Sequence, residues 1–305
     1  MSEQVVAVGR GISLAYEEIG DAAGEPLLLV AGLGQQLHSW PDAFCEELAG
    51  RGYRVVRFDN RDIGRSTHED FRPPKLPAML LGRFPARQYD LGDLAEDTVG
   101  LLDGLGIEST HIVGVSMGGM ISQTVAARHP DRVRTLTSIM STTGSRWIGR
   151  PALSTLRLMG AAPPRAREEA IERALTMFRQ IGSHGFPFDE EVVRERAGRG
   201  WDRDPSSAGT GRQLGAILRS GDRTPSLRSV TAPTLVIHGD RDRMVHPTGG
   251  AATVRAITGA RLETIPGMGH DLPKGAWPRL IDLIDNHARA TRSTDARDTR
   301  DTTAS

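Results

Sequence analysis

Ser116 occupies a position where a serine could act as a nucleophile. It lies between Gly114 and Gly118 in the run "HIVGVSMGGM", which leaves an apolar, β-branched segment and enters a helix-forming one. A serine hydroxyl is too weakly acidic to attack a carbonyl carbon unaided, so it needs a neighbouring base. Small residues also ease tight turns, and in a chain with 35 glycines the motif is weak by itself. Its meaning depends on the surrounding elements and on the partners downstream.

Candidate partners for this serine follow at two later points in the chain. The run "HGDRDRMVHP" offers Asp240 and Asp242, and the run "GMGHDLP" offers His270. Serine, acid and histidine in this order are typical of a nucleophile placed on a strand-turn-helix. The histidine would take the serine proton, and the acid would hold the histidine in the required tautomer. The residues alone leave both aspartates as candidates for the acid.

The elements that must position these residues alternate between strand and helix. Short apolar, β-branched runs predict strands at residues 26–32, 53–60, 110–116, 133–141, 233–239 and 260–266. Amphipathic segments between them predict helices within residues 39–52, 89–107 and 117–131. Such alternation favours an α/β fold whose mostly parallel sheet is covered on both faces, with the serine, the acid and the histidine at the carboxyl ends of strands. Residues 5–20 predict an antiparallel hairpin at the sheet edge.

The alternation stops between residues 143 and 228, which divides the chain into parts. This stretch is rich in arginine, alanine, leucine and methionine and is punctuated by proline and glycine. It predicts a helical cap inserted between two strands of a core formed by residues 1–142 and 229–288. Residues 289–305 are polar and charged without apolar periodicity, so we expect a disordered tail there.

Taken together, the motifs resemble those of the α/β-hydrolase superfamily. The runs "GVSMGG", "HGDRDRMVHP", "GMGHDLP" and "FDNRDIGRST" carry the resemblance, which covers roughly residues 12–287. Within the superfamily the chain looks most like methylesterases of the aclacinomycin type. The resemblance implies an α/β-hydrolase fold and a triad of Ser116, His270 and Asp242, because the family spacing Gly-x-x-Asp-x-x-x-x-Pro matches Gly239, Asp242 and Pro247.

The resemblance also implies an oxyanion hole and an ester substrate. Backbone amides of Leu33 and Met117 would stabilise the tetrahedral oxyanion, and the His-Gly pair that precedes the first of them in the family is Ala31-Gly32 here. The substrate implied is a small molecule, a bulky apolar acid esterified to methanol or another small alcohol. Apolar residues of the cap that could line its pocket, or equally form the cap's own core, include Met159, Met177, Phe178 and Trp201.

Other functions use the same residues. An enol-lactonase, a C–C hydrolase or a perhydrolase would need the same triad, and a ligand-binding receptor could keep a slow one. Dehalogenases and epoxide hydrolases are disfavoured, because they carry aspartate where this chain has Ser116. We therefore expect a serine carboxylesterase and leave these alternatives open.

Composition narrows the partners, cofactors and location. The formal net charge is zero, so no global field favours nucleic acid, and no apolar run approaches the roughly 18 residues of a membrane span. Cys45 is the single cysteine, which excludes an internal disulfide. No metal-binding, dinucleotide or phosphate-loop pattern occurs, so we expect no metal and no cofactor. Without a visible signal peptide the expected location is the cytoplasm.

Overall fold

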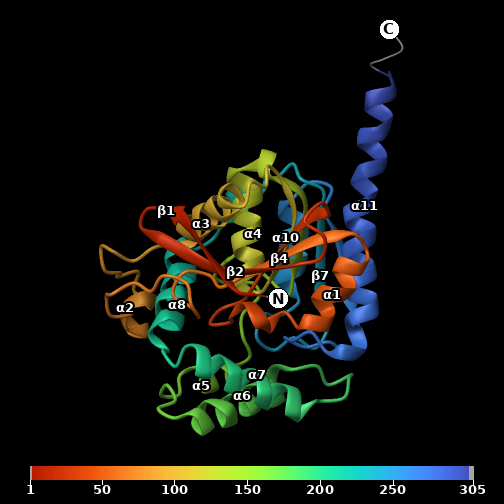
Figure 1. The fold of residues 1–305 in the computed structure, drawn as a ribbon. Helices are drawn as coiled ribbons and strands as arrows, with labels where there is room; N and C mark the ends of the chain where they lie inside the picture. The colour runs from red at the N-terminus through yellow and green to blue at the C-terminus, as the bar shows by residue number, and fades with distance from the viewer. Residues whose placement is uncertain (1, 302–305) are drawn as a thin grey trace.

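The fold is built around one eight-stranded sheet flanked by helices, and it confirms the predicted α/β class (Figure 1). A computed structural model describes the backbone of residues 2–301 and the side chains of residues 2–290. The strand order is β1-β2-β4-β3-β5-β6-β7-β8. The strands are β1 (Gln4–Gly9), β2 (Ile12–Ile19), β3 (Glu25–Val30), β4 (Tyr53–Phe58), β5 (Thr110–Val115), β6 (Val133–Ile139), β7 (Thr234–Gly239) and β8 (Arg261–Ile265).

The first two strands form an antiparallel edge, and the remaining strands run parallel. β1 pairs antiparallel with β2, and β2 pairs antiparallel with β4. β4, β3, β5, β6, β7 and β8 pair parallel to one another. Parallel pairing of six strands brings their carboxyl ends to one edge of the sheet, where sites of open α/β sheets form.

Both faces of the sheet are buried, which explains the uninterrupted apolar runs. In β3, Leu27 and Leu29 pack in a core with α1 (Asp42–Gly50) and α11 (Trp277–Asp301). Leu28 and Val30 point to the other face and pack in a core with α3 (Leu91–Gly104) and α4 (Met117–Arg128). α10 (Thr248–Ala256) contributes Ala256 to that second core. A strand buried on both sides has no polar alternation to show.

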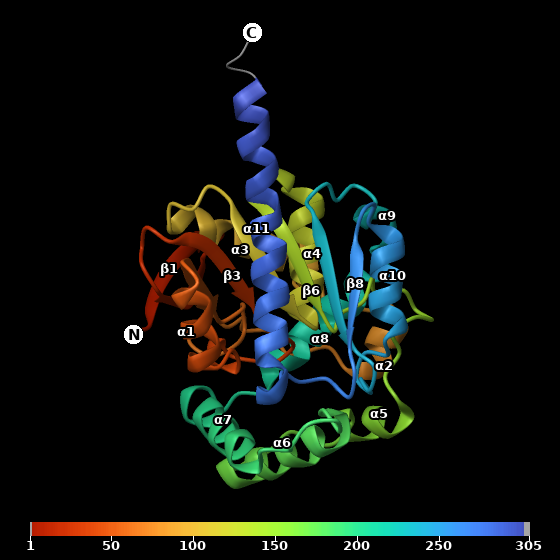
Figure 2. The ribbon, with the colours of Figure 1, turned by 90° about the vertical axis from the view of Figure 1, so that its right-hand side faces the viewer.

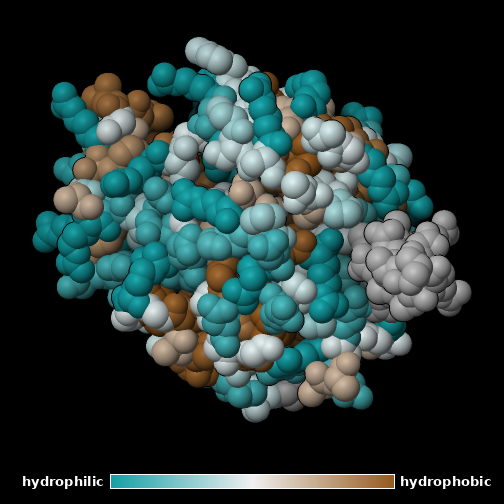
Figure 3. Space-filling model, turned by 90° about the horizontal axis from the view of Figure 1, so that it is seen from above, coloured by the Kyte–Doolittle hydropathy of each residue, from teal (hydrophilic) through white to brown (hydrophobic). Residues whose placement is uncertain are grey.

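Five helices lie between β6 and β7. They are α5 (Leu153–Met159), α6 (Arg167–Ile181), α7 (Glu190–Arg203), α8 (Ala208–Ser220) and α9 (Thr224–Leu227). Figures 1 and 2 show α5, α6 and α7 as a separate layer at one end of the sheet, whereas α8 returns to lie beside the core. Figure 3 views the opposite end, whose surface is mostly hydrophilic with scattered apolar areas. Short elements complete the chain: α2 (Leu76–Leu80), η1 (Leu37–Ser39), η2 (Pro130–Arg132) and η3 (Lys274–Ala276).

The C-terminal segment differs from the disordered tail that its composition suggested. α11 continues as a helix through Asp301, and it projects beyond the body in both ribbon views (Figures 1 and 2). The sequence permits this, because no glycine or proline follows Pro278 before the helix ends. Residues 302–305, the rest of the predicted tail, lie outside the described residues. No helix in the described part of the chain is long and apolar enough to cross a membrane.

Candidate active site

Ser116 forms the turn between β5 and α4 in a strained backbone conformation. Its φ is 55° and its ψ is −118°, a combination that non-glycine residues rarely adopt. The Ser116 amide donates to the Ile139 carbonyl at 2.9 Å, and its carbonyl accepts from the Ser141 hydroxyl at 2.8 Å. The Ser116 side chain does not cap α4. Hydrogen bonds with β6 and with the segment after it therefore hold the turn while the hydroxyl remains available.

The neighbouring glycines are required by close backbone approach. A Cβ added to Gly114 would lie 2.2 Å from the Gly118 carbonyl oxygen. One added to Gly118 would lie 2.1 Å from the Val30 carbonyl oxygen, which is the end of β3. These distances are far inside van der Waals contact, so only glycine fits at either position. The Gly-x-Ser-x-Gly pattern thus allows α4 to start directly against the sheet.

Ser116, His270 and Asp242 form one hydrogen-bonded row. His270 Nε2 lies 3.0 Å from Ser116 Oγ, and His270 Nδ1 lies 2.7 Å from Asp242 Oδ2. The three residues come from the ends of β5, β8 and β7, which the parallel sheet brings to one edge. Asp242 is buried, and the His270 side chain is 10% exposed. With Nδ1 donating to the carboxylate, Nε2 presents its lone pair to the serine hydroxyl.

Asp242 is anchored as an ionised carboxylate. Its Oδ1 accepts hydrogen bonds from the amides of Met244 and Val245, at 2.8 and 2.9 Å. His238 Nε2 lies 3.4 Å from Oδ2. Burial raises the pKa of Asp242, but the charge of His270 and the hydrogen bonds from both histidines outweigh it and hold the pKa well below its ordinary value. His238, which is itself a residue of β7, therefore supports the acid.

Asp240, the rival acid, lies outside this row. Its Oδ1 accepts from the Gly267 amide at 2.7 Å, and its side chain is 40% exposed. Asp240 therefore links the loop after β7 to the loop after β8, and it makes no hydrogen bond to His270. A hollow of about 690 Å³ borders this loop and is lined by both aspartates, His184 and His246. Asp242 borders this hollow but Ser116 and His270 do not line it, so the hollow reaches only the acid end of the catalytic row.

Met117 follows Ser116 directly in the chain, and Leu33 follows Gly32, which lies beside Ser116. Met117 is the first residue of α4, and a Cβ on Gly32 would lie 3.4 Å from the Ser116 Cβ. Within the described residues, neither the Leu33 amide nor the Met117 amide donates a hydrogen bond to another group. Both N–H groups are therefore free to bind an oxyanion, and their role as the oxyanion hole stays a prediction.

The loop that carries Leu33 is held by side chains from distant segments. Asn60 Nδ2 donates to the Ala31 carbonyl at 3.1 Å, and Gly34 donates its amide to Gln213 Oε1 at 3.0 Å. Gln213 is fully buried on α8, and its Nε2 donates to the Arg61 carbonyl. The loop is therefore fixed although Ala31 replaces the family's histidine. Sequence reasoning missed Gln213, because nothing near it in the chain indicates a link to residue 34.

The end of α6 fixes the loop that carries His270. The His270 amide donates to the Ile181 carbonyl at 2.7 Å, and the Gly269 amide donates to Ser183 Oγ at 2.8 Å. Ser183 Oγ in turn donates to Asp271 at 2.5 Å. Burial raises the pKa of Asp271, although the Ser183 hydrogen bonds oppose that rise. The insertion thus positions the histidine as well as covering that end of the sheet, a role with no sequence signal.

The four predicted pocket residues all lie in the insertion and are half-buried. Met159 ends α5, Met177 and Phe178 are on α6, and Trp201 is on α7. Phe178 packs against a small core of Ile171, Leu175 and Val193 between α6 and α7. Part of this set therefore forms the insertion's own core, and contact with a substrate stays a prediction for all four. No cluster of three or more His, Cys, Asp or Glu side chains in the described residues could hold a metal ion.

Comparison with known proteins decides the family. A family model described as the alpha/beta hydrolase fold matches residues 25–273. The chain belongs to this family. Among characterised relatives it is similar to the rhodomycin D methylesterase DnrP of Streptomyces peucetius, with 31% identity over 302 residues, covering 92% of this chain and 96% of that protein. The resemblance to methylesterases is therefore confirmed.

Relatives with other hydrolytic reactions share the α/β-hydrolase fold. The 2-hydroxy-6-oxononadienedioate/2-hydroxy-6-oxononatrienedioate hydrolase of Paraburkholderia xenovorans is 27% identical over 264 residues, covering 85% of this chain and 84% of that protein. Among solved structures, the esterase RhEst1 from Rhodococcus sp. ECU1013 has a TM-score of 0.76 at 20% identity, covering 95% of this chain and all (100%) of that chain. The protein is an α/β-hydrolase with methylesterases among its relatives.

Proposed function

We propose that the protein is a serine carboxylesterase that works through an acyl-enzyme. The observation that carries the proposal is the row Ser116–His270–Asp242, with hydrogen bonds of 3.0 and 2.7 Å. The similarity to a rhodomycin D methylesterase supports an ester as the substrate. Methyl or other small-alcohol esters of bulky apolar acids are the proposed substrate class.

In the proposed reaction, Ser116 Oγ attacks the ester carbonyl while its proton passes to His270 Nε2. The carbonyl oxygen becomes an oxyanion, which the amides of Leu33 and Met117 stabilise by about 2.7–4 kcal/mol for each donor. The protonated His270 then gives its proton to the alkoxide, and the alcohol leaves. Asp242, held ionised, stabilises the histidine cation in both halves of the cycle.

Hydrolysis of the acyl-enzyme repeats these steps with water. His270 Nε2 takes a proton from water, whose oxygen attacks the acyl carbon, and the bond to Ser116 Oγ breaks as the proton returns to the serine. The acid is released and the enzyme is restored. The whole cycle uses protein groups and water.

We further propose that residues 143–228 act as a cap that covers Ser116 and selects the substrate. The hydrogen bonds that the His270 loop donates to Ile181 and Ser183 support this role, because they tie the insertion to the catalytic row. Substitutions of half-buried residues such as Met177 or Trp201 should then change relative rates between esters more than the free energy of unfolding. Equal changes in all rates would contradict a role in selection.

Labelling by a fluorophosphonate probe tests the nucleophile. We expect the native enzyme to be labelled, and Ser116→Ala to lose both the label and esterase turnover by several orders of magnitude. Ser122→Ala is the matched control, since Ser122 lies on the same helix and bonds the Gly118 carbonyl. The control should be labelled like the native enzyme. Undiminished labelling of Ser116→Ala would refute the assignment.

An ester panel tests the substrate class. After correction for leaving-group reactivity, kcat/KM should be higher for methyl esters of polycyclic or large aromatic acids than for p-nitrophenyl acetate. γ-Lactones and long-chain lipid esters serve as controls. A clear preference for lactones would favour the lactonase alternative, and failure to cleave any bulky methyl ester would leave a short-chain esterase.

A further inference from the structure

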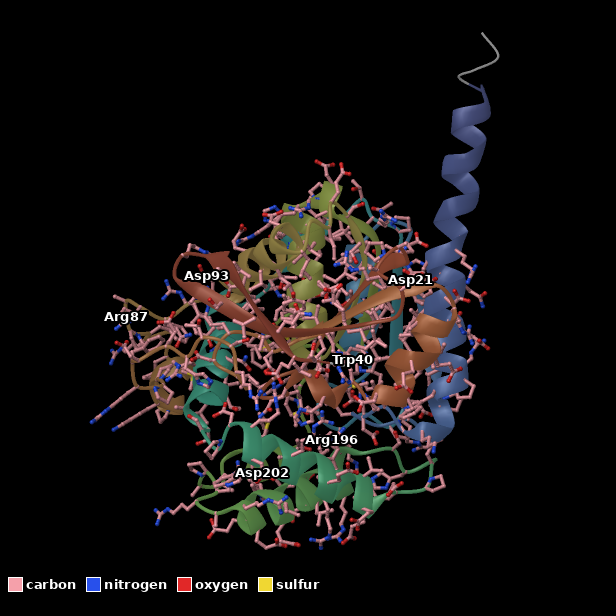
Figure 4. All side chains as sticks on the ribbon, in the orientation of Figure 1. Asp21, Trp40, Arg87, Asp93, Arg196 and Asp202 are labelled. Atoms are coloured by element: carbon pink, nitrogen blue, oxygen red, sulfur yellow. The ribbon has the colours of Figure 1, made fainter. Side chains whose placement is uncertain are left out.

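Arg196 lies on α7, on the side of the insertion that faces the sheet. Within the described residues no group of opposite charge is in contact with it. Its guanidinium carbon lies 4.5 Å from the centre of the Phe178 ring. Within the described residues the guanidinium has neither an ion pair nor a hydrogen bond, and burial lowers the pKa of Arg196. Figure 4 shows it where α7 faces the sheet, on the same side as Trp40. A partly buried guanidinium therefore holds five N–H donors with no acceptor.

The buried and nearly buried arginines of the described residues have partners, although Nε of Arg223 has none. Arg223 donates to two backbone carbonyls and to Gln123. Four more are paired with carboxylates: Arg57 with Glu17, Arg61 with Asp97, Arg203 with Asp59 and Arg212 with Asp62, at 2.6 to 2.8 Å. The fold thus satisfies its buried cations as a rule, because an unpaired one is costly. Arg196 is half-buried and has no such partner, so its donors are free for a group from outside the chain.

Arg196 lies near the loop that carries His270. Its guanidinium faces the ring of Phe178, which is about one helical turn before Ile181, and the Ile181 carbonyl accepts from the His270 amide. Asp271, the residue after His270, attracts the charge of Arg196 from beyond contact distance.

The segment that follows Leu33 also reaches α7, where the Gly200 carbonyl accepts from Gln36 Nε2 at 2.8 Å. The free donors of Arg196 therefore belong to a part of the insertion that contacts both the His270 loop and the segment after Leu33.

We propose that Arg196 is a specificity-determining residue that binds a carboxylate carried by the substrate away from the scissile ester. A guanidinium can hold both oxygens of a carboxylate with two parallel hydrogen bonds, and the withdrawal of this site from water strengthens them. The face of the Phe178 ring contacts the Arg196 guanidinium and holds it in place. The inference rests on the proposed ester hydrolysis and narrows its substrates to amphiphilic acids with one further anionic group.

Hydrolysis of matched esters tests this inference. The pair is the monomethyl ester and the dimethyl ester of one aromatic dicarboxylic acid, so only the free carboxylate differs. We expect the native enzyme to favour the monomethyl ester. In Arg196→Gln, kcat/KM for that ester should fall about 10- to 100-fold, mainly through KM, because one charge-assisted pair is lost. The rate for the dimethyl ester should change less than about 3-fold, and Arg196→Lys should recover part of the loss.

Arg199→Gln is the matched control. Arg199 lies on the same helix, its side chain is 46% exposed, and its contact with Asp42 is long at 3.9 Å. This variant should keep the native ratio between the two esters. An unchanged ratio in Arg196→Gln would overturn the inference, and so would an equal fall for both esters together with a lower Tm, which would indicate a packing role.

A binding measurement separates this inference from the proposed function. Titration calorimetry with the free aromatic dicarboxylate needs no catalysis. The native enzyme and Ser116→Ala should bind it alike, and Arg196→Gln should bind it at least about 10-fold more weakly. If no ester is cleaved but this difference persists, the esterase proposal fails and the carboxylate site stands. If esters are cleaved and the variants bind the dicarboxylate equally, only the carboxylate site fails.

Discussion

Asp242→Asn tests whether the geometry of the acid fixes the tautomer of His270. The native carboxylate uses both oxygens, Oδ1 for the amides of Met244 and Val245 and Oδ2 for His270 Nδ1. Asparagine offers one oxygen and one NH2 group in the same shape. Two backbone donors at Oδ1 outnumber the single strong donor at Oδ2, so the amide oxygen should take the Oδ1 position. The NH2 group then faces His270.

The size of the effect follows from this orientation. An NH2 group only donates, so His270 Nδ1 must present a lone pair and its proton moves to Nε2. Nε2 then donates toward Ser116 Oγ across the 3.0 Å contact and no longer accepts the serine proton. We expect a fall in kcat of about 10⁴, equivalent to about 5.4 kcal/mol of transition-state stabilisation. The variant should stay folded, because the two bonds at Oδ1 survive.

The assay is kcat and kcat/KM with an activated acetate ester, together with the rate of fluorophosphonate labelling and the Tm. Asp240→Asn is the matched control, because Asp240 accepts from the Gly267 amide, lies 3.9 Å from the exposed Arg241 and is itself 40% exposed. We expect it to change kcat less than about 3-fold. A loss below 10-fold in Asp242→Asn, or a larger loss in Asp240→Asn, would refute the reasoning.

Three further predictions concern the glycine turn around Ser116, the loop that carries Leu33, and the pH dependence of stability. Gly118→Ala should prevent soluble expression or lower Tm sharply, since its Cβ would meet the Val30 carbonyl at 2.1 Å; a native Tm would contradict this. Gln213→Leu should lower kcat about 10-fold or more with little change in KM, because the Gly34 amide beside the oxyanion loop loses its acceptor. Steady-state kinetics test this, and Gln213→Glu, which keeps an acceptor, is the control. Burial first, and then the charge of Arg261, lower the pKa of His287 to about 4, against hydrogen bonds to backbone carbonyls that raise it. In the unfolded chain the pKa of a histidine is about 6.5, so the unfolded state binds the proton first as pH falls. The free energy of unfolding should therefore fall by up to about 1.4 kcal/mol per pH unit between pH 6.5 and pH 4. Urea unfolding of the native protein and of His287→Gln across that pH range tests this prediction. The same pH dependence of the free energy of unfolding in both proteins would contradict it.

The strands and the serine turn could be predicted because their signals are local. Leu27 to Val30 are apolar without a break because both faces of β3 are buried, and that pattern is visible in the chain. Gly114 and Gly118 bracket Ser116 because the close approach requires glycine at both positions. The tail shows the limit of this reasoning. Its polar composition suggested disorder, yet a helix without glycine or proline continues to Asp301.

What the sequence by itself determined is the family, the parallel sheet and the identity of Ser116 and His270 as candidates at strand ends. Periodicity, turn residues and motif order carry that information within a few residues of each position. The family spacing implied Asp242 rather than Asp240, and the tertiary structure places Asp242 against His270. Only the tertiary structure joined Gln213 to Gly34 across 179 residues. The unpaired state of Arg196 is likewise a property of everything packed around it. Such contacts depend on how distant segments meet in space, and no local pattern records them.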